Sequence, residues 1–215
     1  MATNPTGSAP SLVTRAKNII LSPKSEWQVI DGEPATVGSL YGGYIAILAA
    51  IPPIAMAVGW LLFGLNLIIV VIHPSITYIL TSAITQYVLA LVGVFVLALI
   101  IDALAPTFGG TKNRIQALKA AGYSYTPAWI AGILYIVPAL GMLVLLAAIY
   151  SLYLLYLGIP VLMKSAPDKK GTYLAAVIVA AIVVYLVIAA VGAAVTRSVS
   201  PLPTMGTPAG YSLPG

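Results

Sequence analysis

The sequence predicts an all-α fold: a polytopic integral membrane bundle of five transmembrane helices with a short amphipathic cytoplasmic helix near the amino terminus. Two observations predict it. Hydrophobic residues make up 60% of the 215 residues and charged residues only 7%, whereas a soluble domain has roughly 25% charged residues. The basic residues also form three clusters, at 15–24, 112–119 and 164–170, separated by long apolar stretches.

The three clusters orient the crossings. Short loops rich in Lys and Arg stay in the cytoplasm, so an even number of crossings must separate one cluster from the next. We therefore expect a cytoplasmic amino terminus and a carboxyl terminus on the opposite side. The membrane domain covers residues 11–196, and residues 1–10 and 197–215 are expected to be disordered tails.

Two short helices are expected before the first span. Residues 11–21 place apolar side chains on one helical face, which indicates an amphipathic helix on the membrane surface. Ser22 and Pro23 indicate an N-cap and a first helical position, and Trp27 is a natural interface anchor. In the alternative interpretation, both helices simply pack under the membrane domain.

The first span is predicted at residues 40–63. Pro52 and Pro53 remove backbone hydrogen bonds and predict a kink near Ala49. Small residues recur every four positions and form a ridge that allows close helix approach: Gly38, Gly42, Ala46 and Ala50. Residues 66–77 follow as an uncharged outside loop.

The second span is predicted at residues 78–104, with a polar outer half. Thr81, Thr85 and Gln86 either line a cavity or bond within the bundle. The span ends at Asp102, a carboxylate at the hydrocarbon edge, which is costly and often functional. In the other interpretation, Asp102 pairs at headgroup depth with Lys112 or Arg114 of a basic loop.

Three further spans complete the bundle. Residues 128–163 form one uncharged run, and a helix of that length would measure roughly 54 Å, against a hydrocarbon core of about 30 Å. Because both flanking loops are basic, we expect two short spans, at 128–140 and 142–163, or a re-entrant hairpin. The last span is predicted at 173–196.

The ionisable residues exclude most chemistry. The chain has no cysteine, one histidine and five carboxylates. We therefore expect no catalytic residue, no metal site and no cofactor, because each needs a nucleophile, base or ligand set with a positioned partner. The basic residues lie at span ends and form no helical stripe, so nucleic acid is not an expected partner. The expected partners are the lipid bilayer, other membrane proteins or a second copy, with no small-molecule substrate indicated.

Four stretches carry a family resemblance: RAKNIILSPKSEW, SLYGGYIAILAAIPPIA, GYSYTPAWIAGIL and SLYLLYLGIPVLMKSAPDK. With them, residues 11–196 resemble the Yip (Ypt/Rab-interacting protein) membrane domain family, most closely its bacterial branch. The resemblance implies five spans and a cytoplasmic amino terminus, here in a bacterial inner membrane with a periplasmic carboxyl terminus. Eukaryotic members bind prenylated Rab GTPases in vesicle traffic, a partner that a bacterium lacks.

The family's motifs supply the candidate partner-binding residues. Asp102 and Pro106 match the D-L-Y-G-P-F motif in identity and spacing, while the residues between them differ. The following G-Y motif is similar to residues 122–127. The candidates are Asp102, Pro106, Gly122, Tyr123, Ser124 and Pro127, which we expect in a cytoplasmic loop at 102–127.

Two functions remain open from the sequence. The first is a non-catalytic multi-pass membrane protein that binds membrane partners or organises the bilayer, in line with the small-residue ridges and the amphipathic helix. The second is a small transporter or channel component. Broken helices often frame transport sites, and the double proline breaks the first span.

Overall fold

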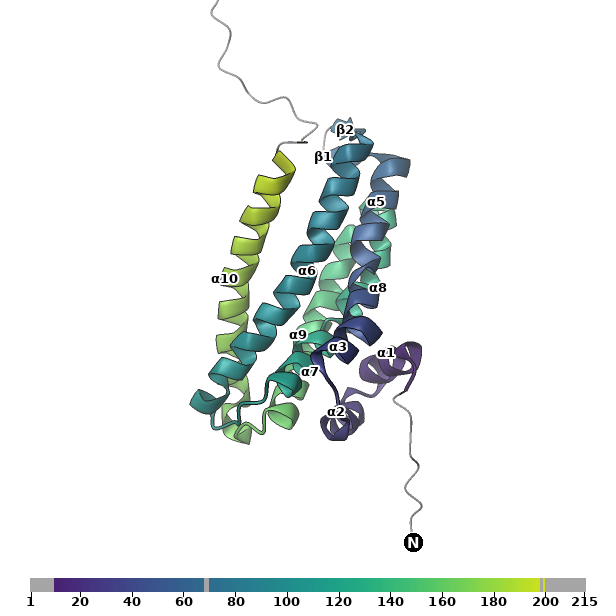
Figure 1. Ribbon diagram of the computed structural model, residues 1–215. Helices are drawn as coiled ribbons and strands as arrows, with labels where there is room; N and C mark the ends of the chain where they lie inside the picture. Colours follow the sequence, from purple (N-terminus) through teal and green to yellow (C-terminus); the bar gives the residue numbers. More distant parts are fainter. Residues whose placement is uncertain (1–9, 68–69, 198, 200–215) are drawn as a thin grey trace, which may run out of the picture.

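The protein is a bundle of long helices with a pair of short helices packed at one end (Figure 1). The computed structural model describes residues 10–67, 70–197 and 199, with the side chains at 66, 67 and 70 left out. The expected tails at 1–10 and 197–215 lie almost wholly outside the described residues. The short pair and the end of α10 lie at opposite ends of the bundle.

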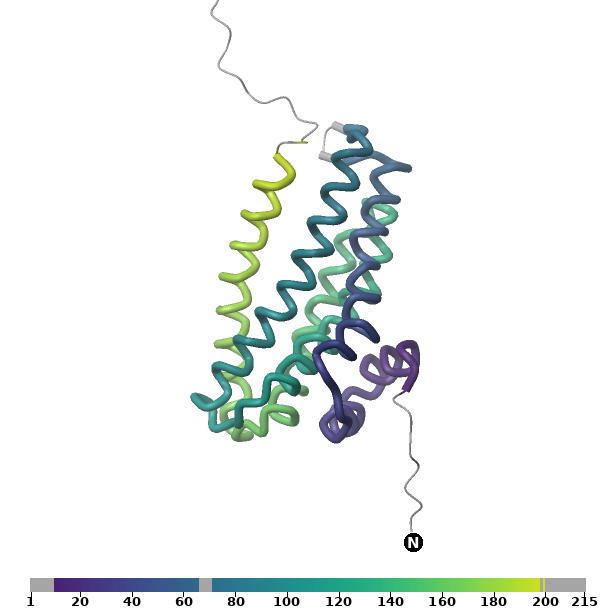
Figure 2. Tube along the Cα trace, viewed as in Figure 1, coloured from purple at the N-terminus to yellow at the C-terminus, as the bar shows by residue number. Residues whose placement is uncertain are grey.

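The long helices lie side by side, and each runs along the long axis of the bundle (Figure 2). The first part comprises α1 (Leu12–Leu21), α2 (Pro23–Gly32), α3 (Val37–Leu40), the π-helical η1 (Tyr41–Ile45), α4 (Ala46–Ala49) and α5 (Ile51–Phe63). Strands β1 (Leu65–Leu67) and β2 (Val70–Ile72), α6 (Ile76–Leu104) and η2 (Ala105–Phe108) come next. The rest comprises α7 (Arg114–Ser124), α8 (Thr126–Ala131), η3 (Gly132–Ile136), η4 (Pro138–Leu143), α9 (Val144–Leu162), η5 (Pro167–Lys169) and α10 (Lys170–Arg197).

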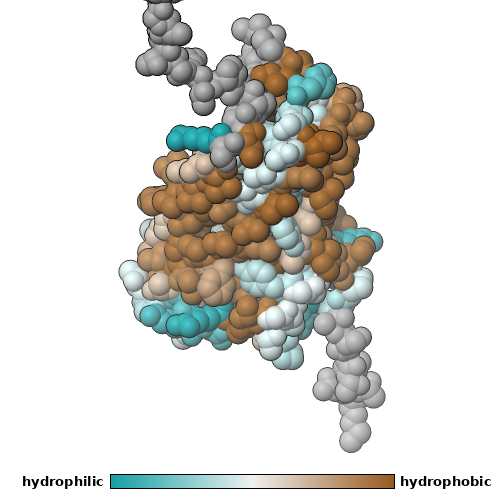
Figure 3. Space-filling view, turned by 45° about the horizontal axis from the view of Figure 1, so that its top comes forward, coloured by the Kyte–Doolittle hydropathy of each residue, from teal (hydrophilic) through white to brown (hydrophobic). Residues whose placement is uncertain are grey.

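Four helical stretches are long and apolar enough to cross a membrane, judged over the described residues. They are Val37–Phe63, Ile76–Phe108, Pro138–Leu162 and Pro167–Arg197. Their lipid-facing side chains form the broad hydrophobic belt in Figure 3, and hydrophilic residues gather toward the ends. The protein is therefore a multi-pass, all-helical membrane bundle. The predicted span at 128–140 is not among the four.

The segment at 111–131 differs from the predicted basic loop. Helix α7 already begins at Arg114, with Asn113 accepting hydrogen bonds at its N-cap from the amides of Ile115 and Gln116. Only Tyr125 separates α7 from α8, so the chain re-enters the bundle about fourteen residues earlier than expected. The loop expectation was wrong because Lys119 is buried here, at 3% exposure. Long basic side chains can bury their stems and charge when polar groups meet them.

The first apolar stretch is broken, as the prolines predict. Helix α4 ends at Ala49 and α5 begins at Ile51, with a turn between them. The expected small-residue ridge does not pack, however: a Cβ atom added at Gly42 would meet nothing within 4 Å. Close approach occurs instead at Gly59, where an added Cβ would lie 2.4 Å from the carbonyl oxygen of Tyr135. The crossing between α5 and η3 therefore depends on a bare backbone.

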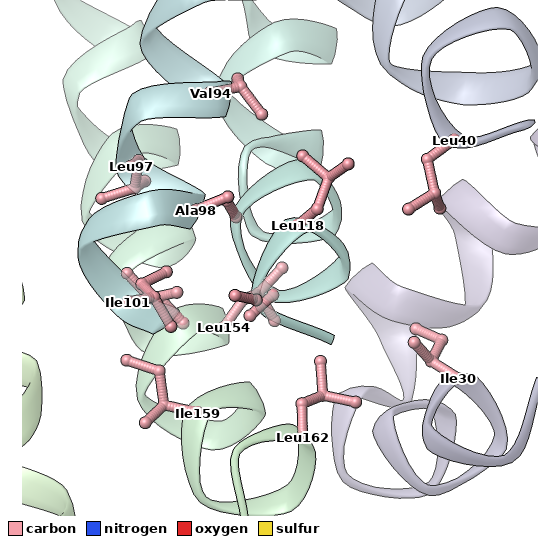
Figure 4. Packing of buried hydrophobic residues seen from close by; sticks show 14 of the residues in the cluster. Ile30, Leu40, Val94, Leu97, Ala98, Ile101, Leu118, Leu154, Ile159 and Leu162 are labelled. Atoms are coloured by element: carbon pink, nitrogen blue, oxygen red, sulfur yellow. The ribbon is translucent and has the colours of Figure 1, made fainter. Parts of the chain in front are cut away.

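Two short strands replace part of the predicted outside loop. Strands β1 and β2 pair antiparallel, with Leu65 opposite Ile72. Gly64 ends α5 with a positive φ of 73°, a conformation that a side chain disfavours. The buried core lies toward the other end of the bundle, where residues of α6, α7 and α9 meet the α1–α2 pair (Figure 4). That end carries the densest polar contacts.

Candidate functional site

Helices α1 and α2 contact each other and form a helical pair, hereafter the α1–α2 hairpin, that is held together by Arg15. Arg15 of α1 donates to Glu26 of α2 through Nη1 and to both carboxylate oxygens of Glu33 through Nη2. The side chains of Arg15 and Glu26 are 3% and 7% exposed. Such a fork geometry is the strongest form of ion pair available to arginine.

The surroundings of Arg15 keep its guanidinium group positively charged. Burial alone lowers the pKa of the guanidinium, but the hydrogen bond to Glu33 and its negative charge outweigh burial, so the pKa is raised. The guanidinium also lies 5.6 Å from the ring centroid of Tyr123. A cation over an aromatic face contributes about 0.5–2 kcal/mol. Arg15 therefore links the hairpin to α7 as well as closing it.

Helix α7 holds the carboxyl end of α2. The Nζ atom of Lys119 donates to the carbonyl oxygen of Ile30 at 2.8 Å and to that of Glu33. The Nε2 atom of Gln116 donates to the backbone and side-chain oxygens of Asp31, both at 3.0 Å. The last carbonyls of a helix lack internal partners and favour a cation. Lys119 is thus an external cap for α2.

The chain around α9 completes the attachment. Tyr150 donates from its hydroxyl to the carbonyl oxygen of Ile20 at 2.7 Å, and Lys164 forms an ion pair with Asp31. Trp27 of α2 is fully buried against Gly158 of α9, where an added Cβ would lie 2.7 Å from its ring. Trp27 is therefore a packing residue and not the interface anchor that its type suggests. One face of the hairpin thus packs against the bundle, as in the alternative interpretation, while the opposite face stays exposed.

A cleft of about 300 Å³ lies beside this network. The residues that line it come from α1, the 33–40 segment, η1 and α7: Pro10, Leu12, Arg15, Glu33, Pro34, Ala35, Ser39, Leu40, Gly43, Tyr44, Lys119 and Tyr123. Its aromatic wall is the edge-to-face pair of Tyr44 and Tyr123, with ring centroids 4.7 Å apart. Tyr44 belongs to the π-helix η1, a backbone form often found at functional sites.

The G-Y motif residues lie in and around this cleft, not in an exposed loop. Tyr123 lines the cleft, and Gly122 packs so closely on Ile45 that an added Cβ would lie 2.8 Å from it. Ser124 and Pro127 are buried where α7 meets α8. The hydroxyl of Ser124 has no hydrogen-bond partner among the described residues.

The other two candidate residues lie at the end of α6. Asp102 is 8% exposed, and its Oδ1 atom has no hydrogen-bond partner in the described part of the chain. Neither Lys112 nor Arg114 forms the expected ion pair with it there. Pro106 is exposed in η2. The structure therefore joins Gly122, Tyr123, Ser124 and Pro127 in one helical unit, while no hydrogen bond or ion pair within the described residues links Asp102 to that unit.

Sequence reasoning missed the carboxylate partners of Arg15, which lies beside Tyr123. Glu26 and Glu33 lie seven residues apart, which places two of the chain's five carboxylates on one helical face. That spacing could have indicated a cationic partner, because a buried carboxylate in an apolar-rich chain needs one. No cluster of three metal-ligating side chains occurs among the described residues.

Comparisons with known proteins agree with the fold. The Yip1 domain model matches residues 17–190. The chain is 30% identical over 142 residues to the inner membrane protein YohC of Escherichia coli strain K12, covering 64% of this chain and 73% of that protein. The YohC protein of the Escherichia coli O6:H1 strain matches to the same extent. No solved structure matches the chain. The protein belongs to the Yip1 domain family.

Proposed function

We propose that this protein is a non-catalytic inner-membrane protein that organises the bilayer by laying its α1–α2 hairpin on one membrane surface. One observation carries the proposal. The face of the hairpin turned away from the bundle exposes three apolar side chains, Val13, Leu21 and Val29, at 72%, 67% and 51%. Lys17 and Lys24 are exposed on the same two helices.

The spacing on α1 fits a lipid surface. Val13, Lys17 and Leu21 recur every four residues and form one stripe of the helix. Ala16 and Ile19 of α1 are buried in the bundle, so Val13 and Leu21 are the apolar side chains of this stripe that remain free to enter a bilayer interface. Each lysine near an anionic surface contributes about 1 kcal/mol. The buried contacts of Arg15, Lys119 and Trp27 fix the opposite face. The hairpin is thus fixed to the bundle by one face and exposes its opposite face.

A fluorescent reporter tests this arrangement, because the chain has no native cysteine. A Val13→Cys variant carrying an environment-sensitive dye is expected to report an apolar setting in vesicles with phosphatidylglycerol, and to be quenched by nitroxide-labelled acyl chains. Reversing Lys17 and Lys24 to Glu should lower the inserted fraction more than tenfold in its equilibrium constant. The same dye at Gln28 is the control, expected to remain in water.

Two results would contradict the proposal. The first is an aqueous Val13 dye in anionic vesicles. The second is a dye that becomes apolar only when native membrane proteins are added, which would favour a protein partner. A partner captured from native membranes and lost on Tyr123→Ala would point the same way. Solute flux through proteoliposomes that Gln86→Ala abolishes would favour the transporter alternative.

We further propose that the chain crosses the membrane five times, with the third crossing built from α7, α8 and η3. These elements span residues 114–136. At 1.5 Å per residue in the α-helix and 2.0 Å in the 3₁₀ part, they reach roughly 37 Å, enough for a hydrocarbon core of about 30 Å. The basic residues gather at the hairpin end, which supports a cytoplasmic amino terminus.

A topology reporter checks the number of crossings. Alkaline phosphatase fused after Thr196 is expected to be active, because the carboxyl end would be periplasmic, and the same enzyme fused after Gly110 is expected to be inactive. A fusion after Gly141 should again be active. Inactivity at Thr196 would mean an even number of crossings, and inactivity at Gly141 would mean a re-entrant hairpin.

A further inference from the structure

A second cavity lies at the other end of the bundle, away from the hairpin. Its volume is about 450 Å³, within the range of small-ligand sites. The lining side chains come from α5, α6, the α7–α8 junction and α10. They are Met56, Trp60, Tyr78, Ser82, Thr85, Gln86, Leu89, Ala90, Gly93, Val94, Tyr125, Trp129, Tyr185, Ile188, Ala189, Gly192, Ala193 and Thr196.

Three neighbouring polar side chains of α6 line this cavity: Ser82 is buried, Thr85 is half-buried and Gln86 is exposed. Ser82 is 8% exposed, and its hydroxyl has no hydrogen-bond partner in the described part of the chain. Among the described residues, the side chains of Thr85 and Gln86 also form no hydrogen bond. An unsatisfied polar group within a bilayer costs several kcal/mol. None of the three bonds within the bundle among the described residues, and the buried hydroxyl of Ser82 therefore favours a ligand in this cavity.

The outermost of these residues, Ser82, lies at about the depth of the lipid esters. Helix α6 has 29 residues, a length of roughly 43 Å, which matches the full bilayer of about 40–45 Å. Ser82 and Gln86 lie about 9 and 15 Å along the helix from Ile76. With α6 centred in the bilayer, the hydrocarbon core begins about 7 Å from Ile76, so Ser82 lies just inside its edge, where the glycerol esters end, and Gln86 lies about 8 Å inside it, beside the first part of the acyl chains. Tyr78 and Trp60, whose rings stack 5.8 Å apart, lie above them.

The side chains that line the cavity favour an uncharged ligand that has hydrogen-bond acceptors and an apolar tail. No Asp, Glu, Lys, Arg or His is among the lining residues. The hydroxyls of Ser82 and Thr85 and the amide of Gln86 can donate to carbonyl oxygens. Below them the wall is apolar, through Leu89, Val94 and Ile188. We propose that this cavity binds the ester-linked glycerol region and one acyl chain of a phospholipid from the leaflet at the β1–β2 end.

Native mass spectrometry tests the proposal on the full-length protein in detergent. The probes are dioleoyl phosphatidylethanolamine and its dialkyl ether analogue, which lacks both carbonyl oxygens. The wild-type protein is expected to retain the ester lipid at least about tenfold better, since each lost hydrogen bond costs about 0.5–1.5 kcal/mol. The triple change Ser82→Ala, Thr85→Val and Gln86→Leu should remove this preference.

Thr81→Val is the matched control, because Thr81 lies on the same helix and does not line the cavity. It should keep the ester preference. Equal retention of the ester and ether lipids by the wild-type protein would overturn the proposal without any variant having to fold. Displacement of the ester lipid by an equimolar quinone would also overturn it, in favour of a different carbonyl ligand. Loss of the preference in Thr81→Val would mean that the cavity is not the site.

Discussion

Arg15→Ala is expected to release the α1–α2 hairpin from the bundle. The substitution leaves Glu26 buried and Glu33 partly buried, both without the cation that pairs with them. Breaking a buried ion pair from one side costs about 3–5 kcal/mol, which is most of the stability of a local packing unit. Hydrogen exchange by mass spectrometry should show protection of the α1 and α2 amides falling more than about 100-fold.

Two further variants separate charge from geometry. Lys17→Ala removes an exposed lysine of the same helix that forms no ion pair among the described residues, so protection should stay within about twofold. Arg15→Lys keeps the charge and loses the fork, so it should recover only part of the protection. Undiminished protection in Arg15→Ala would show that Trp27 and Lys119 suffice to hold the hairpin.

Gly59→Ala is expected to destabilise the bundle core by forcing α5 and η3 apart. The new methyl group would lie 2.4 Å from the carbonyl oxygen of Tyr135 and 2.7 Å from that of Ile136. Both neighbours are backbone atoms, which cannot rotate away as a side chain can. Overpacking of this kind costs about 1–3 kcal/mol and sometimes more. Unfolding in a mixed micelle of increasing denaturing detergent should begin at a lower detergent fraction.

Gly42→Ala provides the comparison within the same apolar stretch. An added Cβ there meets nothing within 4 Å, so the change should be neutral or should stabilise by about 0.4–1 kcal/mol through the unfolded state. If Gly42→Ala destabilised the protein as much as Gly59→Ala, the ridge that includes Gly42 would be a helix contact, as its spacing predicts. That contact would then lie between copies of the chain.

The sequence predicted the apolar stretches well because the bilayer demands them. Length and lack of charge located the helices that contain Pro52, Thr85 and Tyr173, and the double proline located the break near Ala49. The prediction from the sequence failed where polar partners bury a charged side chain. Lys119 marked a loop by composition, yet carbonyl oxygens 86 and 89 residues earlier in the chain stabilise it inside the fold.

The candidate site was found only in part for the same reason. The family resemblance supplied Tyr123, and the structure places it in a cleft with Arg15 and Glu33. Nothing local in the sequence pairs these residues, because the network depends on how α1, α2 and α7 meet. The π-helix η1 was likewise invisible to residue patterns, since its residues also suit an ordinary helix.

The attachment of the hairpin also sets an order of events during synthesis. The hairpin is made first, but its contacts with Gln116, Tyr150 and Lys164 join residues that are 85, 130 and 133 positions apart. At about 5–20 residues per second, the ribosome needs roughly 7–27 s to supply the last of them. During that interval the hairpin has no bundle to dock on. The hairpin, although made early, can therefore complete its docking only after most of the bundle has been synthesised.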